Sequence, residues 1–302
     1  MTATISQPPA ALAGAPRTPR SRRFGIAMMT TGAAGNQLGA GIGAHAFDAI
    51  GPAGVVAMRQ LVAASVLLPV ARPPFRRMTW AQWWPALLLA GVFGCMNLAL
   101  YSAIDRIGLG LAVTLEFLGP LAVALAASRG RRDLVAAAVA GAGVYALVLP
   151  GPTSDYLGLG LGLAAAACWA AYIALNRVVG VRLPGLQGPA VATTGSALAY
   201  LPVLLVLAGN DRLVGMPVVY AVAAGLLSSV VPYAADLTAL RSVPPRFFGI
   251  FMSAHPVLAA LAGVALLGEG LAPNQWAGIA LVVAANVLAA TTTGHHDRPP
   301  RG

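Results

Sequence analysis

Long runs of apolar residues, separated by short breaks, fill the chain from Phe24 to about residue 291. The breaks carry Pro, Gly, Arg or Asp, which are residues that commonly end apolar helices. Each run is about 20 residues long, the length that an α-helix needs to cross a bilayer, and none shows the alternation typical of strands. The pattern predicts an all-α integral membrane protein with ten transmembrane helices, at roughly residues 24–44, 52–71, 81–103, 108–128, 133–150, 157–178, 188–208, 214–238, 247–267 and 273–291.

The two ends of the chain differ in composition from the runs between them. Residues 1–23 are rich in Pro, Ala and Arg, so they are predicted to form a disordered basic arm. Residues 293–302 are predicted to be a polar tail. The regions 24–150 and 151–292 remain, and each holds five of the predicted spans.

The composition decides between two classes of protein. The net charge of +10 is typical of nucleic-acid-binding proteins, but 58% of the residues are hydrophobic and only 9% are charged. A soluble domain has about 25% charged residues, and the basic residues here form short, separated clusters rather than one face. The lipid bilayer is therefore the predicted partner, and binding to nucleic acid is excluded.

The arginines indicate the orientation in the membrane. All 19 basic residues are Arg, and 16 of them fall on one side if the N-terminus is cytoplasmic. Arg106 and Arg212 fall on the other side, and Arg59 lies inside a span. By the positive-inside rule this predicts a multi-pass protein with both termini in the cytoplasm. The localisation that we expect is the bacterial cytoplasmic (inner) membrane.

An internal repeat relates the two halves of the chain. The segment Leu115-Glu-Phe-Leu-Gly-Pro-Leu-Ala-Val-Ala-Leu resembles Phe251-Met-Ser-Ala-His-Pro-Val-Leu-Ala-Ala-Leu at an offset of 136 residues. Because five is an odd number of spans, the two halves are predicted to lie in the membrane in opposite orientations. Inverted five-helix repeats are typical of secondary transporters, with the substrate site near the middle of the membrane.

Several segments carry a resemblance to a known family, and they extend from about residue 30 to 290. They are Cys95-Met-Asn-Leu-Ala-Leu-Tyr, Gly108 to Leu125, Ala167-Cys-Trp-Ala-Ala-Tyr-Ile, and Pro232 to Glu269. The chain resembles the EamA-type, ten-span drug/metabolite transporter superfamily, and within it the threonine/homoserine exporter group. The resemblance implies export of a small amino acid or related metabolite by proton antiport with alternating access. The chain departs from the group at His255, where a carboxylate is usual, and near Ala44, where a lysine is expected.

Ionisable residues inside the spans are the first candidates for function, because a charge in hydrocarbon is costly. Glu116 and His255 each lie about eight residues, or roughly 12 Å, into their spans. We expect both to take part in proton coupling, and the repeat places them close enough to meet. The alternative for each is a structural role, as a carboxyl or an imidazole held by hydrogen bonds.

Other polar residues within the spans are candidates for substrate binding. Arg59 can bind a carboxylate of the substrate, or it can form a structural ion pair. Asp236 is a further candidate, and the alternative for it is a charge that costs little because it lies close to the cytoplasmic end of its predicted span. The neutral candidates have helix–helix hydrogen bonding as their more common role; they are Asn97, Tyr101, Tyr172 and Tyr233, with Asn36, Gln37 and Asn176 as further polar positions.

Glycine and proline predict the local geometry of three spans. Gly35, Gly39 and Gly43 are spaced by four residues and predict close packing of the first span against a neighbour. Pro120 and Pro256, at equivalent positions of the repeat, predict kinks in the fourth and ninth spans. Both kinks then lie beside the proposed proton-coupling residues.

Competing functions have weaker support in the sequence. Cys95 and Cys168 are isolated, and no H-E-x-x-H motif is present, so no metal or cofactor is predicted and an intramembrane enzyme is the weakest alternative. A nucleotide-binding P-loop needs a lysine, and the chain has none. A facilitative exchanger or a channel for a small molecule remains open, and nothing indicates an oligomeric state.

Overall fold

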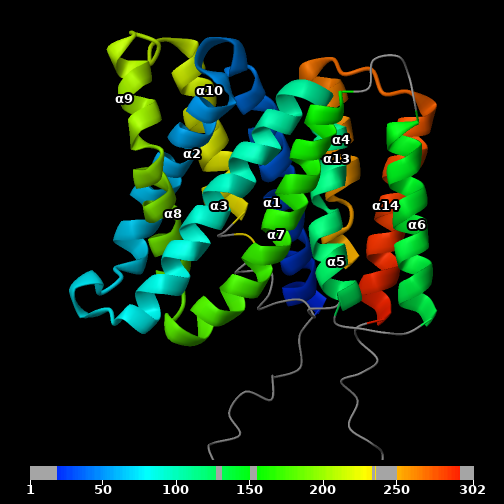
Figure 1. Ribbon diagram of the computed structural model, residues 1–302, viewed down its shortest axis with the longest axis horizontal. Coiled ribbons are helices and arrows are strands. Elements are labelled where there is room, and N and C mark those ends of the chain that lie inside the picture. The colour runs from blue at the N-terminus through cyan, green and yellow to red at the C-terminus, as the bar shows by residue number, and fades with distance from the viewer. Residues whose placement is uncertain (1–18, 127–130, 150–154, 233–234, 236–249, 293–302) are drawn as a thin grey trace, which may run out of the picture.

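The computed structural model describes residues 19–126, 131–149, 155–232, 235 and 250–292 (Figure 1). All regular elements in these ranges are helical, which confirms the all-α prediction. They are α1 (Pro19–Ala44), α2 (Phe47–Ala71), η1 (Phe75–Arg77), α3 (Trp80–Ile107), α4 (Leu109–Glu116), α5 (Leu118–Ala126), α6 (Arg131–Val148), α7 (Tyr156–Arg182), α8 (Gln187–Ala199), α9 (Leu201–Gly209), α10 (Met216–Gly225), the π-helical turn η2 (Leu226–Val230), α13 (His255–Leu267) and α14 (Pro273–Thr292).

Six helical segments of the described chain are long and apolar enough to cross a membrane. They are Phe47–Ala71, Trp80–Ile107, Leu109–Ala126, Tyr156–Arg182, Ile250–Leu267 and Pro273–Thr291. The pair α8 and α9 makes a seventh if its 41° bend lies within one span. Segments Asp133–Val148 and Met216–Val230 are apolar but shorter. These lengths indicate a multi-pass membrane protein.

Two helices start earlier than their apolar runs predict. α1 begins at Pro19, inside the segment 1–23 that was expected to be a disordered arm, so residues 19–23 are a correction to that expectation. Arginine is a good helix former, so the helix continues beyond the apolar run. α2 begins at Phe47 instead of 52 and includes Gly51, whose φ of 69° bends the chain at the start of the helix.

Two helical breaks occur at equivalent positions of the repeat. α4 is interrupted at Phe117 before α5 begins, and a turn at Ser253 and Ala254 precedes α13. Each break lies three residues before a proline, Pro120 or Pro256, whose ring excludes the carbonyl of the preceding turn and lacks an N–H. The helices are thus interrupted close to the positions where the prolines predict kinks, and the break leaves Glu116 as the last residue of α4.

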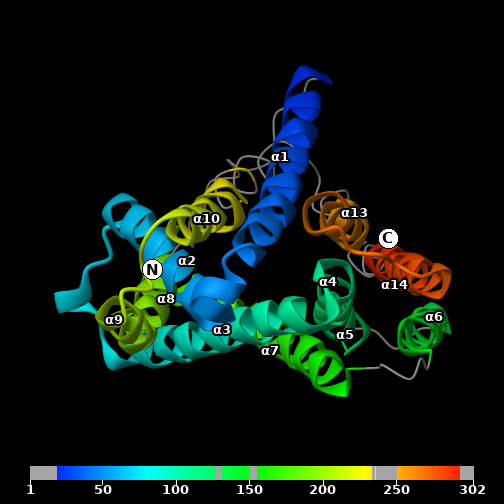
Figure 2. The same ribbon diagram turned by 90° about the horizontal axis from the view of Figure 1, so that it is seen from above.

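The helices pack in pairs that join the first half of the chain to the second. α6 lies along α14 at one edge of the molecule, and α2, α8 and α9 lie at the opposite edge (Figure 2). Between these edges α3 packs along α7, α4 packs on α13 and α7, and α1 packs on α10, η2 and α13. The largest apolar core lies around the fully buried Tyr101 of α3.

Close approach of α1 to η2 and α10 depends on glycine. A Cβ on Gly39 would collide with Ser228, and one on Gly43 would lie 2.9 Å from Ala224 Cβ. Gly35 faces Leu227 and Val231 in the same way. The predicted small-residue contact of the first span is therefore confirmed, and its partner is the segment of the chain that ends in η2.

Candidate functional site

A cavity of about 360 Å³ lies between α1, α2, α3, α4, α7 and η2. Its volume is in the range of pockets for small ligands. The walls combine aromatic and apolar side chains with one guanidinium, one carboxyl and several amides and hydroxyls. The lining residues are Asn36, Gln37, Ala40, Arg59, Phe93, Met96, Asn97, Leu100, Tyr101, Val113, Glu116, Phe117, Trp169, Tyr172, Ser228, Ser229 and Pro232.

Seven of the polar residues named from the sequence line this cavity, although they come from five different helices. They are Asn36, Gln37, Arg59, Asn97, Tyr101, Glu116 and Tyr172. Tyr233 and Asp236 lie outside the described residues. His255 is buried beside the cavity but is not part of its wall.

Arg59 is buried and is held by the second half of the chain. Its Nε donates to Ser229 Oγ over 3.1 Å, and its Nη2 donates to the carbonyl oxygen of Ser228 over 2.9 Å. The guanidinium carbon lies 5.2 Å from the centroid of the Tyr101 ring. These contacts fix the plane of the guanidinium, and Nη1 has no hydrogen-bond partner in the described chain. A guanidinium that is held in one orientation and has free N–H donors is suited to bind a carboxylate.

Glu116 supplies the opposite charge. It is 7% exposed, it ends α4 at the break, and it lines the same cavity as Arg59. Among the lining residues, Arg59 is the basic side chain and Glu116 is the acidic one. The cavity can therefore hold a small molecule that has both a negative and a positive group.

Tyr101 and Asn97 have different freedom to bind a ligand. The Tyr101 hydroxyl is buried and has no hydrogen-bond partner in the described residues, so it is available to a polar ligand. The Asn97 side-chain nitrogen donates to the Phe93 carbonyl over 2.7 Å, so part of its capacity is used within α3. The Tyr172 ring stacks on Phe93 at 5.6 Å and forms an apolar wall.

His255 contacts a residue that the sequence analysis did not pair with it. Its Nδ1 lies 3.2 Å from the Gln37 side-chain nitrogen, which is a donor, and its ring centroid lies 5.5 Å from that of Phe117. The repeat predicts that His255 approaches Glu116, and its hydrogen-bond partner in the described chain is Gln37. Because Gln37 lines the cavity, His255 reaches the site through that amide.

Ser228 and Ser229 are site residues that sequence reasoning missed. Both are buried in η2, and they supply the two acceptors for Arg59. Serine is common in apolar helices, and the spacing of residues does not reveal a π-helical turn. Such turns frequently mark functional sites in helical proteins.

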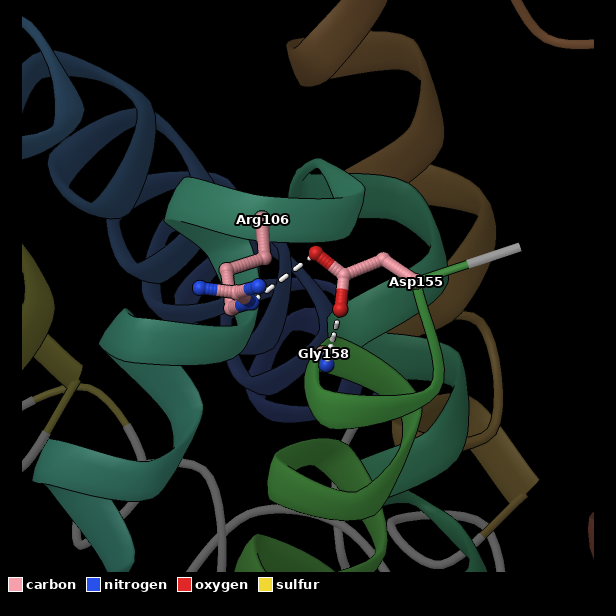
Figure 3. Close-up of polar contacts among 3 residues, drawn as sticks. All are labelled: Arg106, Asp155 and Gly158. Atoms are coloured by element: carbon pink, nitrogen blue, oxygen red, sulfur yellow. Dashed lines mark hydrogen bonds and ion pairs between the residues drawn. The ribbon is translucent and has the colours of Figure 1, made fainter. Parts of the chain in front are cut away.

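One end of the bundle carries polar contacts between the two halves. We call it the upper end, where α3 ends and α7 begins (Figure 1). There Arg106 Nε lies 2.8 Å from Asp155 Oδ2, and Asp155 Oδ1 accepts from the Gly158 N–H over 2.9 Å (Figure 3). The Gly158 N–H, followed by Arg106, lowers the pKa of Asp155. The carboxylate thus joins α3 to the start of α7.

Glu269 makes a second connection at the upper end. Its carboxylate accepts from the N–H groups of Leu109, at 2.6 Å, and Gly110, at 3.5 Å, which start α4. Burial raises the pKa of Glu269, while these N–H groups act in the opposite direction. The side chain fits between Gly108 and Gly263, where a Cβ would collide with the carboxylate. The loop after α13 is thereby tied to α4.

Replacing Gly263 by Ala is expected to destabilise the protein by ~1–3 kcal/mol, because the added methyl group needs the space of the Glu269 carboxylate. Thermal unfolding in detergent measures the loss. Gly270→Ala is the matched control, since a Cβ there meets no atom within 4 Å. The double variant Gly263→Ala/Glu269→Ala should show no added penalty from Gly263→Ala; an undiminished penalty would contradict this explanation.

A metal site is not formed by the described residues, because no group of three or more His, Cys, Asp or Glu side chains lies close enough together. The cavity also contains no cluster of basic residues, since Arg59 is the cation among its lining residues.

Known proteins are similar to this chain in sequence or in fold. Residues 156–291 match the EamA-like transporter family. The threonine/homoserine exporter RhtA of Escherichia coli (strain K12) is 34% identical over 268 residues, which are 87% of this chain and 90% of that protein. RhtA of Salmonella typhimurium (strain LT2) is 34% identical over 257 residues, which are 83% and 86% of the two chains.

A solved crystal structure shares the fold alone. It has a TM-score of 0.60 and 17% identity, and the match covers 92% of this chain and 99% of the other. The two exporters have the identity and coverage that establish a family relationship. The chain therefore belongs to the EamA-like transporters of the drug/metabolite transporter superfamily, and it is a multi-pass membrane transporter, not an enzyme.

Proposed function

We propose that the protein exports a small amino acid, of the kind that threonine and homoserine represent, across the bacterial cytoplasmic membrane in exchange for protons. The observation that carries this proposal is the presence of Arg59 and Glu116 in the wall of one cavity. An amino acid zwitterion carries a carboxylate and an ammonium group, and the pair offers a partner for each. The exporters that this chain resembles are named for threonine and homoserine, which are both amino acids.

The proposed architecture is ten spans in two inverted repeats, residues 24–150 and 151–292. The helix pairs support it, because the same pairs result when each helix is replaced by its counterpart in the other half. Three pairs each consist of a helix and its own counterpart: α2 with α8, α4 with α13 and α6 with α14. The pair α3 and α7 corresponds to the pair α10 and α1. The equivalent breaks at Phe117 and Ser253 add support.

The proposed orientation places both termini in the cytoplasm. α1 begins and α14 ends at the same, lower end of the bundle (Figure 1). The charged residues at the helix ends support the cytoplasmic assignment of that end by the positive-inside rule. The lower end carries Arg72, Arg76, Arg77, Arg131 and Arg182, and the upper end carries Arg106 and Arg212.

Proton coupling follows from competition at Glu116. The ionised carboxyl binds the substrate ammonium, whereas the protonated carboxyl does not, so a proton and the substrate exclude each other. Arg59 binds the substrate carboxylate. Exclusive binding of two ligands at one group is what antiport requires, because the carrier then crosses with one or the other.

The remaining candidates are proposed to shape the cavity. The free Tyr101 hydroxyl is proposed to bind a polar group of the substrate, and Asn97 and Tyr172 to bound the space that the side chain occupies. His255 is proposed to act on the coupling through Gln37. Tyr233 and Asp236 remain binding candidates on their sequence positions alone.

Alternating access is proposed to arise from movement of the halves around this cavity. In the described conformation the upper end is joined across the halves by Arg106–Asp155 and by Glu269 on α4. Opening toward that side requires these two contacts to separate. The breaks at Phe117 and Ser253 are proposed as hinges within the helical segments Leu109–Ala126 and Ile250–Leu267.

Transport in liposomes tests the function. Purified protein is reconstituted, and uptake of labelled threonine is measured with and without a pH gradient. We expect saturable counterflow and accumulation against the threonine gradient when the compartment that receives threonine is the more acidic. Counterflow without pH-driven accumulation would support a facilitative exchanger, and flux that never saturates would support a channel.

A further inference from the structure

We infer that Ser229 is a positioning residue that sets the orientation of Arg59 and thereby determines recognition of the substrate carboxylate. This inference rests on the proposed function, in which Arg59 binds that group. The one hydrogen bond that the Ser229 side chain makes in the described chain is the one it accepts from Arg59 Nε. The residue belongs to the second half of the chain, whereas Arg59 belongs to the first.

The π-helical turn presents two acceptors to one guanidinium. In η2 the N–H of Val231 bonds the carbonyl of Leu226, five residues earlier, so the turn is wider than an α-helical turn. The Ser228 carbonyl and the Ser229 hydroxyl then reach Nη2 and Nε of Arg59. Two acceptors on different nitrogens fix both the position and the rotation of the planar group.

The two serines of the turn have different partners. The Ser228 hydroxyl donates to the Asn36 carbonyl of α1 over 2.9 Å, where Gly39 leaves room for it. The Ser229 hydroxyl contacts Arg59 instead. Both side chains are equally buried, at 5% and 4% exposure. One hydroxyl therefore fastens the turn to α1, and its neighbour orients the cation.

Loss of the Ser229 hydroxyl leaves Arg59 with one acceptor. The guanidinium can then rotate about its bond to the Ser228 carbonyl, and its free Nη1 no longer has a fixed direction. The Tyr101 ring still lies beside it at 5.2 Å but does not select a rotation within the plane of the group. Binding of a carboxylate should weaken, whereas binding of an uncharged group in its place should not.

The test compares Ser229→Ala with Ser228→Ala in reconstituted protein. KM and Vmax are measured for threonine counterflow, together with competition by threoninol, in which an alcohol replaces the carboxylate. We expect Ser229→Ala to raise KM for threonine about tenfold, as for one bond to a charged group, with Vmax and the threoninol competition unchanged. Ser228→Ala should raise KM clearly less than Ser229→Ala does, because its backbone carbonyl still accepts from Arg59 Nη2.

Two further variants separate positioning from direct contact and from misfolding. Lysine has no Nε–H, so in Arg59→Lys the hydrogen bond that the Ser229 hydroxyl accepts from Arg59 is absent. Adding Ser229→Ala to Arg59→Lys should therefore not change KM for threonine further. Ser229→Cys keeps the volume of the side chain but is a weak acceptor, and it should reproduce the KM increase if Ser229→Ala is not recovered in folded form.

Each contrary result has a distinct meaning. An equal KM increase in Ser228→Ala, an equal loss of threoninol competition, or an undiminished effect in the Arg59→Lys background would each overturn the positioning role while leaving the proposed function intact. Absence of saturable threonine counterflow in the wild-type protein would refute the proposed function itself, and the inference with it.

Discussion

Glu116→Gln is expected to abolish threonine accumulation driven by a pH gradient, reducing the ratio of concentrations across the membrane to about one. The amide has the shape of the carboxyl but cannot take up and release a proton in the physiological range, and it offers no charge to an ammonium group. The side chain ends α4 at the break, so the substitution leaves the apolar packing around it in place. Accumulation in liposomes under an imposed pH gradient measures the effect.

The matched control is Glu269→Gln, the same chemical change at the upper end of the bundle and outside the cavity. It should retain accumulation. Size-exclusion chromatography and thermal unfolding establish that both variants are folded. If Glu116→Gln still concentrates threonine against its gradient, the proposed proton-coupling role is wrong. Adding His255→Ala to either variant shows whether His255 and Glu116 act together, since coupled residues give non-additive effects.

Arg59→Gln is expected to raise KM for threonine by about 100-fold or more, since a buried charged partner of a carboxylate is lost. The change also leaves Glu116 without its charged neighbour in the cavity, and an unpaired buried charge is destabilising. Counterflow kinetics and thermal unfolding measure the two effects separately.

A double variant distinguishes these effects. Arg59→Gln/Glu116→Gln should recover stability because neither charge remains, and it should not recover threonine binding. Arg106→Gln is the control for loss of an arginine elsewhere, because that residue is partly exposed in an ion pair at the upper end. A wild-type KM in Arg59→Gln would remove Arg59 from the site.

The sequence predicts the site residues well where a charged residue, which is costly to bury in a membrane, stands in an apolar run. Arg59 and Glu116 are recognisable because charge inside a span needs a reason, and both line the cavity. Asn97, Tyr101 and Tyr172 also line it, but their positions follow from the packing of α3 against α7, which a single sequence does not specify. Ser228 and Ser229 escape notice because their role depends on a π-helical turn rather than on their chemistry.

Some helix boundaries were likewise predictable from the sequence, and others were not. The kinks before Pro120 and Pro256 follow from the covalent structure of proline and were predictable. The start of α1 at Pro19 was not, because the apolar run marks the part of a helix that lies in the membrane rather than where the helix begins. The contact of His255 with Gln37 depends on how α1 and α13 are rotated against each other, which the repeat alone leaves open.

The single carboxyl among the described lining residues has a consequence for energetics. If Glu116 binds either one proton or one zwitterion, each cycle moves a neutral substrate outward and one positive charge inward. The membrane potential then drives export as well as the pH difference does, at about 2.3 kcal/mol for each 100 mV. That amount supports an approximately fiftyfold concentration ratio, so a cell in neutral surroundings, with no pH difference to use, could still expel its substrate.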